Sequence, residues 1–165
     1  MKDMFCFQCQ QTAHNIGCDG KVGVCGKKAD TAVYQDELIG ALIALANAAE
    51  NGSSTEKTDM LILKGLFTTI TNVNFNNVTI KQLTEEIHIE RNRINSQKFD
   101  DYDMKKLWND HEDIRSLKSL ILFGIKGMAA YAYHAQALGK TDSEVTSFFY
   151  KALRAIGSEN DPEKL

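Results

Sequence analysis

All four cysteines of this chain lie in one short stretch near its start, and this feature constrains the fold more than any other. Their spacing is C-x2-C-x8-C-x6-C, at Cys6, Cys9, Cys18 and Cys25. Two thiolates separated by two residues can reach one metal centre from a single tight loop, and the longer intervals let the chain wrap round to deliver two more ligands. Four glycines in the same stretch supply the backbone freedom that such wrapping needs. We therefore expect residues 1–28 to form a cysteine-rich loop whose thiols are its functional groups.

Spacing alone leaves three interpretations of these thiols open. They suit an iron–sulfur cluster, either [4Fe–4S] or [2Fe–2S], or a structural zinc ion. They could also form two disulfides, for which four cysteines allow three connectivities. Zinc ribbons and knuckles usually offer two C-x2-C pairs and this chain has one, so the spacing favours a cluster over zinc (Zn) without deciding between them. His14 lies inside the loop but is a weaker ligand candidate, because four thiolates already complete a tetrahedral set.

The sequence after the loop has the pattern of an all-α protein. Proline occurs only at Pro162, and no convincing alternation of apolar and polar residues predicts a strand. Apolar residues recur at helical spacing in five segments, which we predict to be helices: residues 31–49, 56–71, 79–94, 112–138 and 141–156. Short connections favour an up-down-up bundle of the first three helices, followed by a helical pair. We take residues 29–165 as one helical bundle domain, with a possible seam in the polar stretch 95–112. That stretch is expected to include a short helical turn around Met104 to Trp108.

Local signals refine these helices. Asp30 is the expected N-cap of the first, and capping boxes of the form Thr-x-x-Gln and Thr-x-x-Glu predict helix starts at Thr79 and Thr141. The helix over 112–138 is the richest in apolar and small residues, so we expect it to be central and buried. Positive charge gathers round the cysteine loop, where the expectation is a solvated rim: Lys2, Lys21, Lys27 and Lys28.

Charge and hydropathy exclude several classes of function. A net charge of −3 and a pI near 5.8 argue against a nucleic-acid or anionic-membrane partner. No secretory signal is visible, and the longest apolar stretch is interrupted by Lys126. Clustered cysteines without a signal peptide point to a reducing compartment, so we expect a cytoplasmic protein.

Several longer motifs resemble one known family. They are MFCFQCQQTA at 4–13, VGVCGK at 22–27, GLFTTITNVNF at 65–75 and DIRSLKSLILFGIKGMAAYAYHA at 113–135. Together they resemble the amino-terminal part of the hybrid cluster protein family, also called prismane proteins or hydroxylamine reductases, and the likeness runs to about residue 157.

This resemblance implies an oxidoreductase that reduces hydroxylamine to ammonia and water. Family members do so at a hybrid iron–sulfur–oxygen cluster whose ligands lie in later domains and have no counterparts here, so we predict no catalytic residue in this chain. The resemblance implies that Cys6, Cys9, Cys18 and Cys25 bind a [4Fe–4S] cluster. The last interval is one residue longer than the compact family pattern, which keeps [2Fe–2S] open.

The expected role is therefore electron transfer. The chain would accept electrons from a redox donor protein and pass them to a catalytic cluster in the remaining domains of the full-length enzyme. Two alternatives belong to other classes: a structural zinc-binding helical interaction module, and a stand-alone iron–sulfur redox carrier or sensor.

Overall fold

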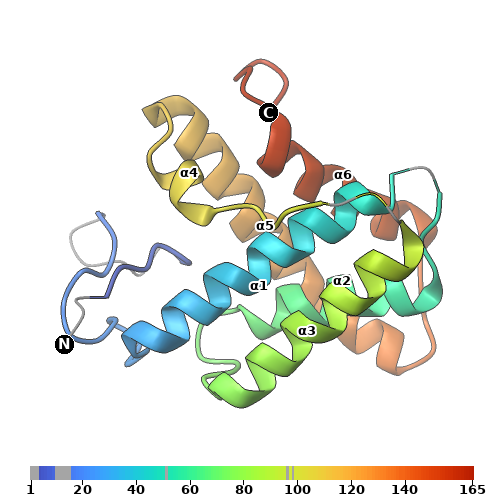
Figure 1. Cartoon of the computed structure of the whole chain (residues 1–165), viewed down its shortest axis with the longest axis horizontal. Helices are drawn as coiled ribbons and strands as arrows, with labels where there is room; N and C mark the ends of the chain where they lie inside the picture. Colours follow the sequence, from blue (N-terminus) through green and yellow to red (C-terminus); the bar gives the residue numbers. More distant parts are fainter. Residues whose placement is uncertain (1–3, 10–15, 51, 96, 98) are drawn as a thin grey trace.

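The fold consists of helices, as the sequence predicts. The computed structural model describes residues 4–9, 16–50, 52–95, 97 and 99–165. Within these residues it forms six helices and no extended strand (Figure 1): α1 Ala29–Ala48, α2 Glu56–Thr68, α3 Asn77–Ile94, α4 Met104–Trp108, α5 Glu112–Ala137 and α6 Ser143–Ser158. The all-α prediction is confirmed, and the short α4 is the helical turn expected within the polar connection.

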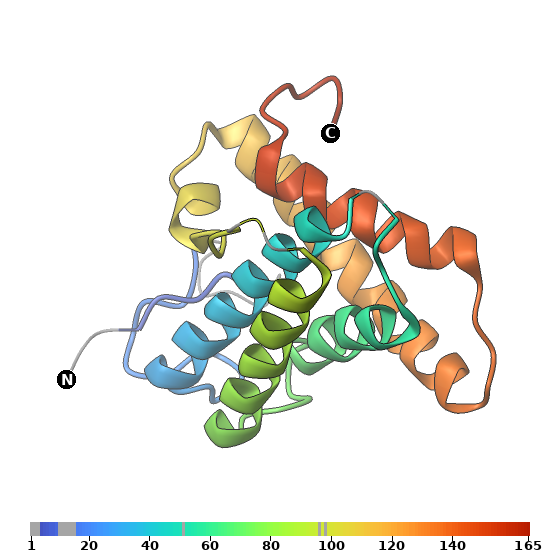
Figure 2. The same cartoon turned by 45° about the vertical axis from the view of Figure 1, so that its right-hand side comes forward.

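Helix α1 is the centre of the molecule. It packs against α2, α3, α4 and α6, and Leu38, Leu42 and Leu45 have no exposed surface. A helix that is apolar nearly all round is stable only when other elements cover it on most sides. Figures 1 and 2 show α3 alongside α1, and Figure 2 shows α5 and α6 packed as a pair to the right of them. The predicted three-helix bundle with an added helical pair is therefore confirmed, and one apolar core includes residues from all six helices.

Three helices begin at residues other than those predicted. Asn76, not Thr79, caps α3, and its side chain accepts hydrogen bonds from two backbone N–H groups at 3.0 and 3.3 Å. Asp142, not Thr141, caps α6 in the same way at 2.8 and 3.1 Å. Asn and Asp are stronger N-caps than Thr, and here a better cap lies next to each predicted box or within three residues of it. Asp30 is also not a cap, since it lies inside the first turn of α1.

Helix α5 is not central, which contradicts the expectation from its composition. Leu120 and Tyr131 are 68% and 83% exposed, and Gly124 and Gly127 have open space beside them. Its buried residues form a single stripe that faces α2, α4 and α6. Small and apolar residues indicate that a helix is suited to close packing, but they do not say that a partner is present on each side.

A buried carboxylate ties α2 to α3. Glu90 has no exposed side-chain surface, accepts from the Thr58 hydroxyl at 2.9 Å, and forms ion pairs with Arg93 at 2.7 Å and Lys57 at 3.3 Å. Hydrogen bonding from Arg93, more than any other contact, lowers the pKa of Glu90 to about 2. A carboxylate held this firmly in its charged form contributes to stability, and that contribution depends on pH.

We expect Glu90→Gln to lower the free energy of unfolding by about 2 kcal/mol at pH 7, the usual size for a hydrogen bond to a charged group. Because the folded pKa is depressed, this contribution is present above the unfolded pKa, near 4.5, and is lost as the pH falls towards 2. Urea unfolding of both proteins at pH 7, 4 and 2.5 checks it. A difference that stays constant over this range would contradict the role given to the charge.

Candidate functional site

The described parts of the cysteine loop precede α1 and pack against its start (Figure 1). Cys6 and Cys18 lie opposite each other as an antiparallel bridge and exchange both backbone hydrogen bonds, at 3.0 and 2.8 Å. Directly opposed residues of such a pair carry their side chains on the same face. Both are buried, and they cluster with Met4 and with Ala32 of α1. Two of the four predicted ligands therefore lie side by side at the base of the loop.

The other two cysteines are half-buried and lie nearer the surface. Cys25 belongs to a turn closed by the N–H of Gly26 on the carbonyl of Gly23 at 2.8 Å. Gly26 has φ +84°, a conformation that side chains other than glycine rarely adopt, as the loop glycines were expected to show. Cys9 lines a small pocket of about 240 Å³ together with Phe123 and Lys126 of α5. The loop thus presents one thiol beside α5 and another in its own final turn.

All four cysteines are free thiols, so the disulfide alternative has no support here, although Cys6 and Cys18 face each other. Among the described residues, no group of three or more His, Cys, Asp or Glu side chains is arranged to hold a metal ion. The donor set has the chemistry of a thiolate-bound metal centre: four thiols on one loop, two of them buried and one beside a cation. Closing all four round one centre requires the loop to rearrange.

Lys27 overturns the expectation of a solvated rim. It is only 3% exposed, and its Nζ donates to the Sγ of Cys6 at 3.5 Å. Burial raises the pKa of the Cys6 thiol, and the charge of Lys27 opposes that rise. Lys21 and Lys28 are exposed as expected, while Lys2 and His14 lie outside the described residues. The rim prediction failed for Lys27 because the chain folds its side chain under the loop rather than outwards.

A buried polar connection links the loop to two helices. Lys126 of α5 donates to the backbone carbonyl of Gln8 at 3.4 Å and to its side-chain oxygen, and the Gln8 amide donates to Asp36 of α1. Burial lowers the pKa of Lys126 to about 7 and raises that of Asp36 to about 6. One signal for this arrangement is visible in the sequence: Lys126 is a charged residue inside an otherwise apolar segment, and such a residue needs a buried partner.

Aromatic side chains fix the loop to α4. Phe5 and Phe7 each lie 4.9 Å from the ring of Trp108, centroid to centroid, and Arg115 lies over the same ring. Phe7 is buried and gives the loop an apolar cover there, whereas Val22 and Val24 are exposed. The cover therefore comes from one side of the loop only.

A family comparison places this loop in a known context. The model of the Prismane/CO dehydrogenase family matches residues 4–165. The chain belongs to this family. The resemblance drawn from the cysteine loop and the later motifs is thereby confirmed, and it extends over both the loop and all six described helices.

Family relatives named hydroxylamine reductase share more than a third of the matched positions. The protein from Caldanaerobacter subterraneus subsp. tengcongensis is 39% identical over 93% of this chain and 33% of its own length. Those from Geobacter metallireducens and Methanocaldococcus jannaschii are 38% and 39% identical over 98% of this chain, and 35% and 34% of their own length. The chain therefore spans about a third of the length of these relatives.

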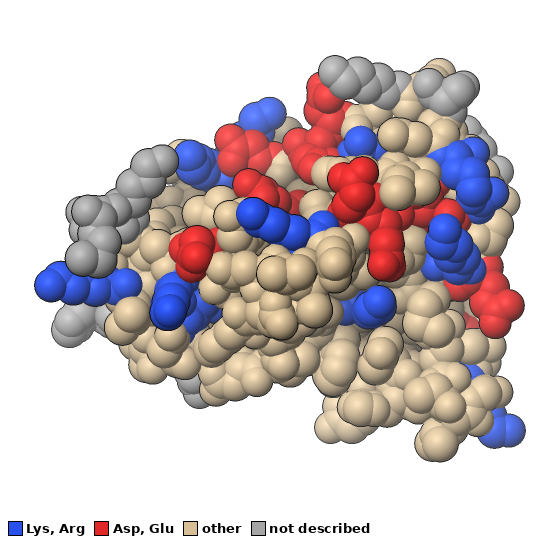
Figure 3. All heavy atoms as spheres, turned by 60° about the horizontal axis from the view of Figure 1, so that its bottom comes forward, with Lys and Arg blue, Asp and Glu red and all other residues tan. Residues whose placement is uncertain are grey.

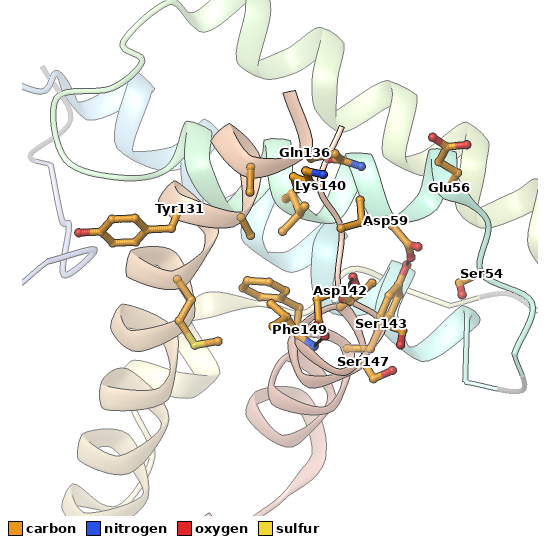
Figure 4. A pocket seen from close by; sticks show the side chains of 18 residues that line it. Ser54, Glu56, Asp59, Tyr131, Gln136, Lys140, Asp142, Ser143, Ser147 and Phe149 are labelled. Carbon is orange, nitrogen blue, oxygen red and sulfur yellow. Dashed lines mark hydrogen bonds between the residues drawn. The ribbon is translucent and has the colours of Figure 1, made fainter. Parts of the chain in front are cut away.

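Two further surface features of this family member bear on function. A cavity of about 820 Å³ lies between α2, α5 and α6, with Asp59 and Asp142 on one side and Tyr131 on the other (Figure 4). Tyr150 donates to Asp59 at 2.7 Å there, and no predicted site residue lines this cavity.

Acidic and basic side chains are interspersed on the face seen in Figure 3, rather than collected by sign. No helix in the described part of the chain is long and apolar enough to cross a membrane.

Proposed function

We propose that this chain is the amino-terminal electron-transfer part of an enzyme of the hydroxylamine-reductase type. Its ligands would be Cys6, Cys9, Cys18 and Cys25, holding a [4Fe–4S] cluster, with [2Fe–2S] as the alternative. The observation that carries the proposal is the loop itself: four free thiols on a glycine-containing turn structure, packed on a helical scaffold, in a member of this family. When bound, such a cluster supplies one-electron transfer.

The four cysteines would have different roles according to how deeply each is buried. Cys6 and Cys18 are buried against Met4 and Ala32, so they would fix the cluster to the scaffold and keep water from its inner side. Cys9 and Cys25 are half-buried, so their side of the loop stays within reach of an electron donor. Backbone N–H groups and buried charges near thiolate ligands are the means by which a protein adjusts a cluster's potential.

Contact with the remaining domains would involve the outer face of α5. Leu120, Gly124, Gly127, Tyr131 and Leu138 lie on one side of this helix and are exposed. An apolar strip of this kind marks an interaction surface, and the two glycines would let another helix approach closely. Because the relatives are about three times as long as the part matched here, we assign this face to a helix from their remaining two thirds.

We also propose the cytoplasm as the compartment. Four free thiols within one loop persist in a reducing environment and would be oxidised outside it. The proposed partners are a redox donor protein and the remaining enzyme domains, with neither nucleic acid nor a membrane among them.

The chain alone should not reduce hydroxylamine, because it spans only about a third of the length of the relatives named hydroxylamine reductase. We expect no turnover above buffer from the anaerobically purified, reduced chain. Turnover should return when the chain replaces the matched part of the Geobacter metallireducens enzyme. Ammonia formation with a dithionite-reduced electron carrier measures both.

The same chimera tests the α5 face. Leu120→Glu places a charge on that face and should abolish turnover, whereas Ile89→Glu, at a 56% exposed position of α3, should leave it unchanged. Measurable turnover by the isolated chain would refute the electron-transfer role, and equal activity of the two chimera variants would refute the assigned contact face.

A further inference from the structure

The base of the cysteine loop contains more buried positive charge than its described neighbours balance. Lys27 and Lys126 are 3% and 4% exposed, and each charge interacts with the other. The acidic side chain that acts on both is Asp36, which is half-buried and hydrogen-bonded to Gln8. Buried charges are costly unless they are paired, so the buried Lys27 leaves a place for further negative charge beside it.

The thiols are the groups that can supply that negative charge. Lys27 Nζ is 3.5 Å from Cys6 Sγ, and Lys126 interacts electrostatically with both Cys6 and Cys9. Metal ligation requires cysteine in the thiolate form, and the negative charge of Cys6 would then lie 3.5 Å from the Lys27 ammonium group. The lysines are therefore placed as counter-charges to a ligand set rather than as surface charges.

We propose that Lys27 raises the reduction potential of the cluster held by this loop, by holding a positive charge against the sulfur of Cys6. This inference rests on the proposed function. One-electron reduction adds one negative charge to the thiolate-bound group, and a buried cation 3.5 Å from a ligand sulfur stabilises that added charge more than it stabilises the oxidised form. Lys27 thus acts on the cluster through its charge beside Cys6 and is not itself a ligand.

The adjacent residue provides a matched control. Lys28 carries the same charge one residue along the chain but is exposed, so solvent screens it. Lys27→Met and Lys28→Met therefore remove the same formal charge from neighbouring positions that differ in burial. Lys27→Arg keeps the charge at the buried position, and Lys27→Gln removes it with a polar side chain in case the methionine variant folds poorly.

The test is a redox titration of each anaerobically purified protein with dithionite and mediators, followed by electron paramagnetic resonance, with iron and sulfide measured on the same samples. We expect Lys27→Met and Lys27→Gln to hold as much iron as wild type. At a fixed potential their ratio of reduced to oxidised protein should be about tenfold lower, which corresponds to a reduction potential lower by about 59 mV for one electron. Lys28→Met should match wild type, and Lys27→Arg should lie closer to wild type than to Lys27→Met.

Other outcomes test the role of Lys27 and the proposed function separately. Three results would overturn the role of Lys27 while leaving the cluster in place in wild type. The reduction potentials of Lys27→Met and Lys27→Gln could equal that of wild type, or Lys28→Met could shift the potential as much as they do. Loss of iron from both Lys27→Met and Lys27→Gln would be the third. Wild-type protein without iron and sulfide would instead overturn the proposed function on which this inference rests.

Discussion

Replacing Cys18 by serine should remove iron and sulfide from the anaerobically purified protein, to less than about a tenth of the wild-type content. Serine's hydroxyl is a poor substitute for a thiolate ligand, and the chain has no fifth cysteine to take its place. Cys18 is also buried directly opposite Cys6, so water or an exogenous thiol cannot easily fill the position. Iron and acid-labile sulfide per chain give the result.

The control for this experiment is a measurement of whether the variant is still folded. Serine is nearly the same size as cysteine and the helices begin only at Ala29, so the circular dichroism of the variant should retain wild-type helix content. If Cys18→Ser kept its full iron with an intact fold, Cys18 would not be a ligand and the four-thiolate assignment would be wrong.

The largest effect on stability is expected at Gly40. A Cβ atom there would lie 2.3 Å from the carbonyl oxygen of Tyr102, whose N–H donates to the Gly40 carbonyl at 3.2 Å. The clash is with backbone rather than with the end of a flexible side chain, so the connection into α4 must move away from α1. We expect Gly40→Ala to lower the free energy of unfolding by about 2 to 3 kcal/mol, as overpacked cores do.

Gly124→Ala is the matched comparison, since this helical glycine has nothing within 4 Å of the added Cβ. Alanine favours the helix over glycine, so this variant should gain about 0.5 to 1 kcal/mol. Urea unfolding of both variants decides the matter. A Gly40→Ala protein as stable as Gly124→Ala would mean that the close crossing at Tyr102 does not constrain α1.

Helix positions were predictable because they follow from the spacing of apolar residues, which the fold preserves. Their exact starts were less so, because Asn76 and Asp142 compete with nearby threonines for the cap and form the stronger bonds. The burial of α5 was mispredicted for a different reason. Its composition suits close packing, yet which of its faces has a partner depends on elements far away in the chain.

The cysteine loop shows what spacing can and cannot predict. It indicated the four thiols and the need for positive φ, which Gly17 and Gly26 adopt. It could not show that Cys6 and Cys18 form a backbone pair, or that Lys27 turns inward to that pair, since both depend on how the loop packs on α1. Metal–thiolate bonds themselves also help to order sites of this kind. The cysteine spacing therefore indicates ligation that the backbone hydrogen bonds of the loop do not.

The central claim is that the loop binds an iron–sulfur cluster, and one measurement tests it directly. The chain is purified without oxygen and analysed for iron, sulfide and zinc, with an electron paramagnetic resonance spectrum of the reduced protein. We expect about four irons and four sulfides per chain, and a signal on reduction that disappears in Cys6→Ser and Cys25→Ser. One zinc ion and no sulfide under strictly anaerobic handling would contradict it and make the loop a structural zinc site.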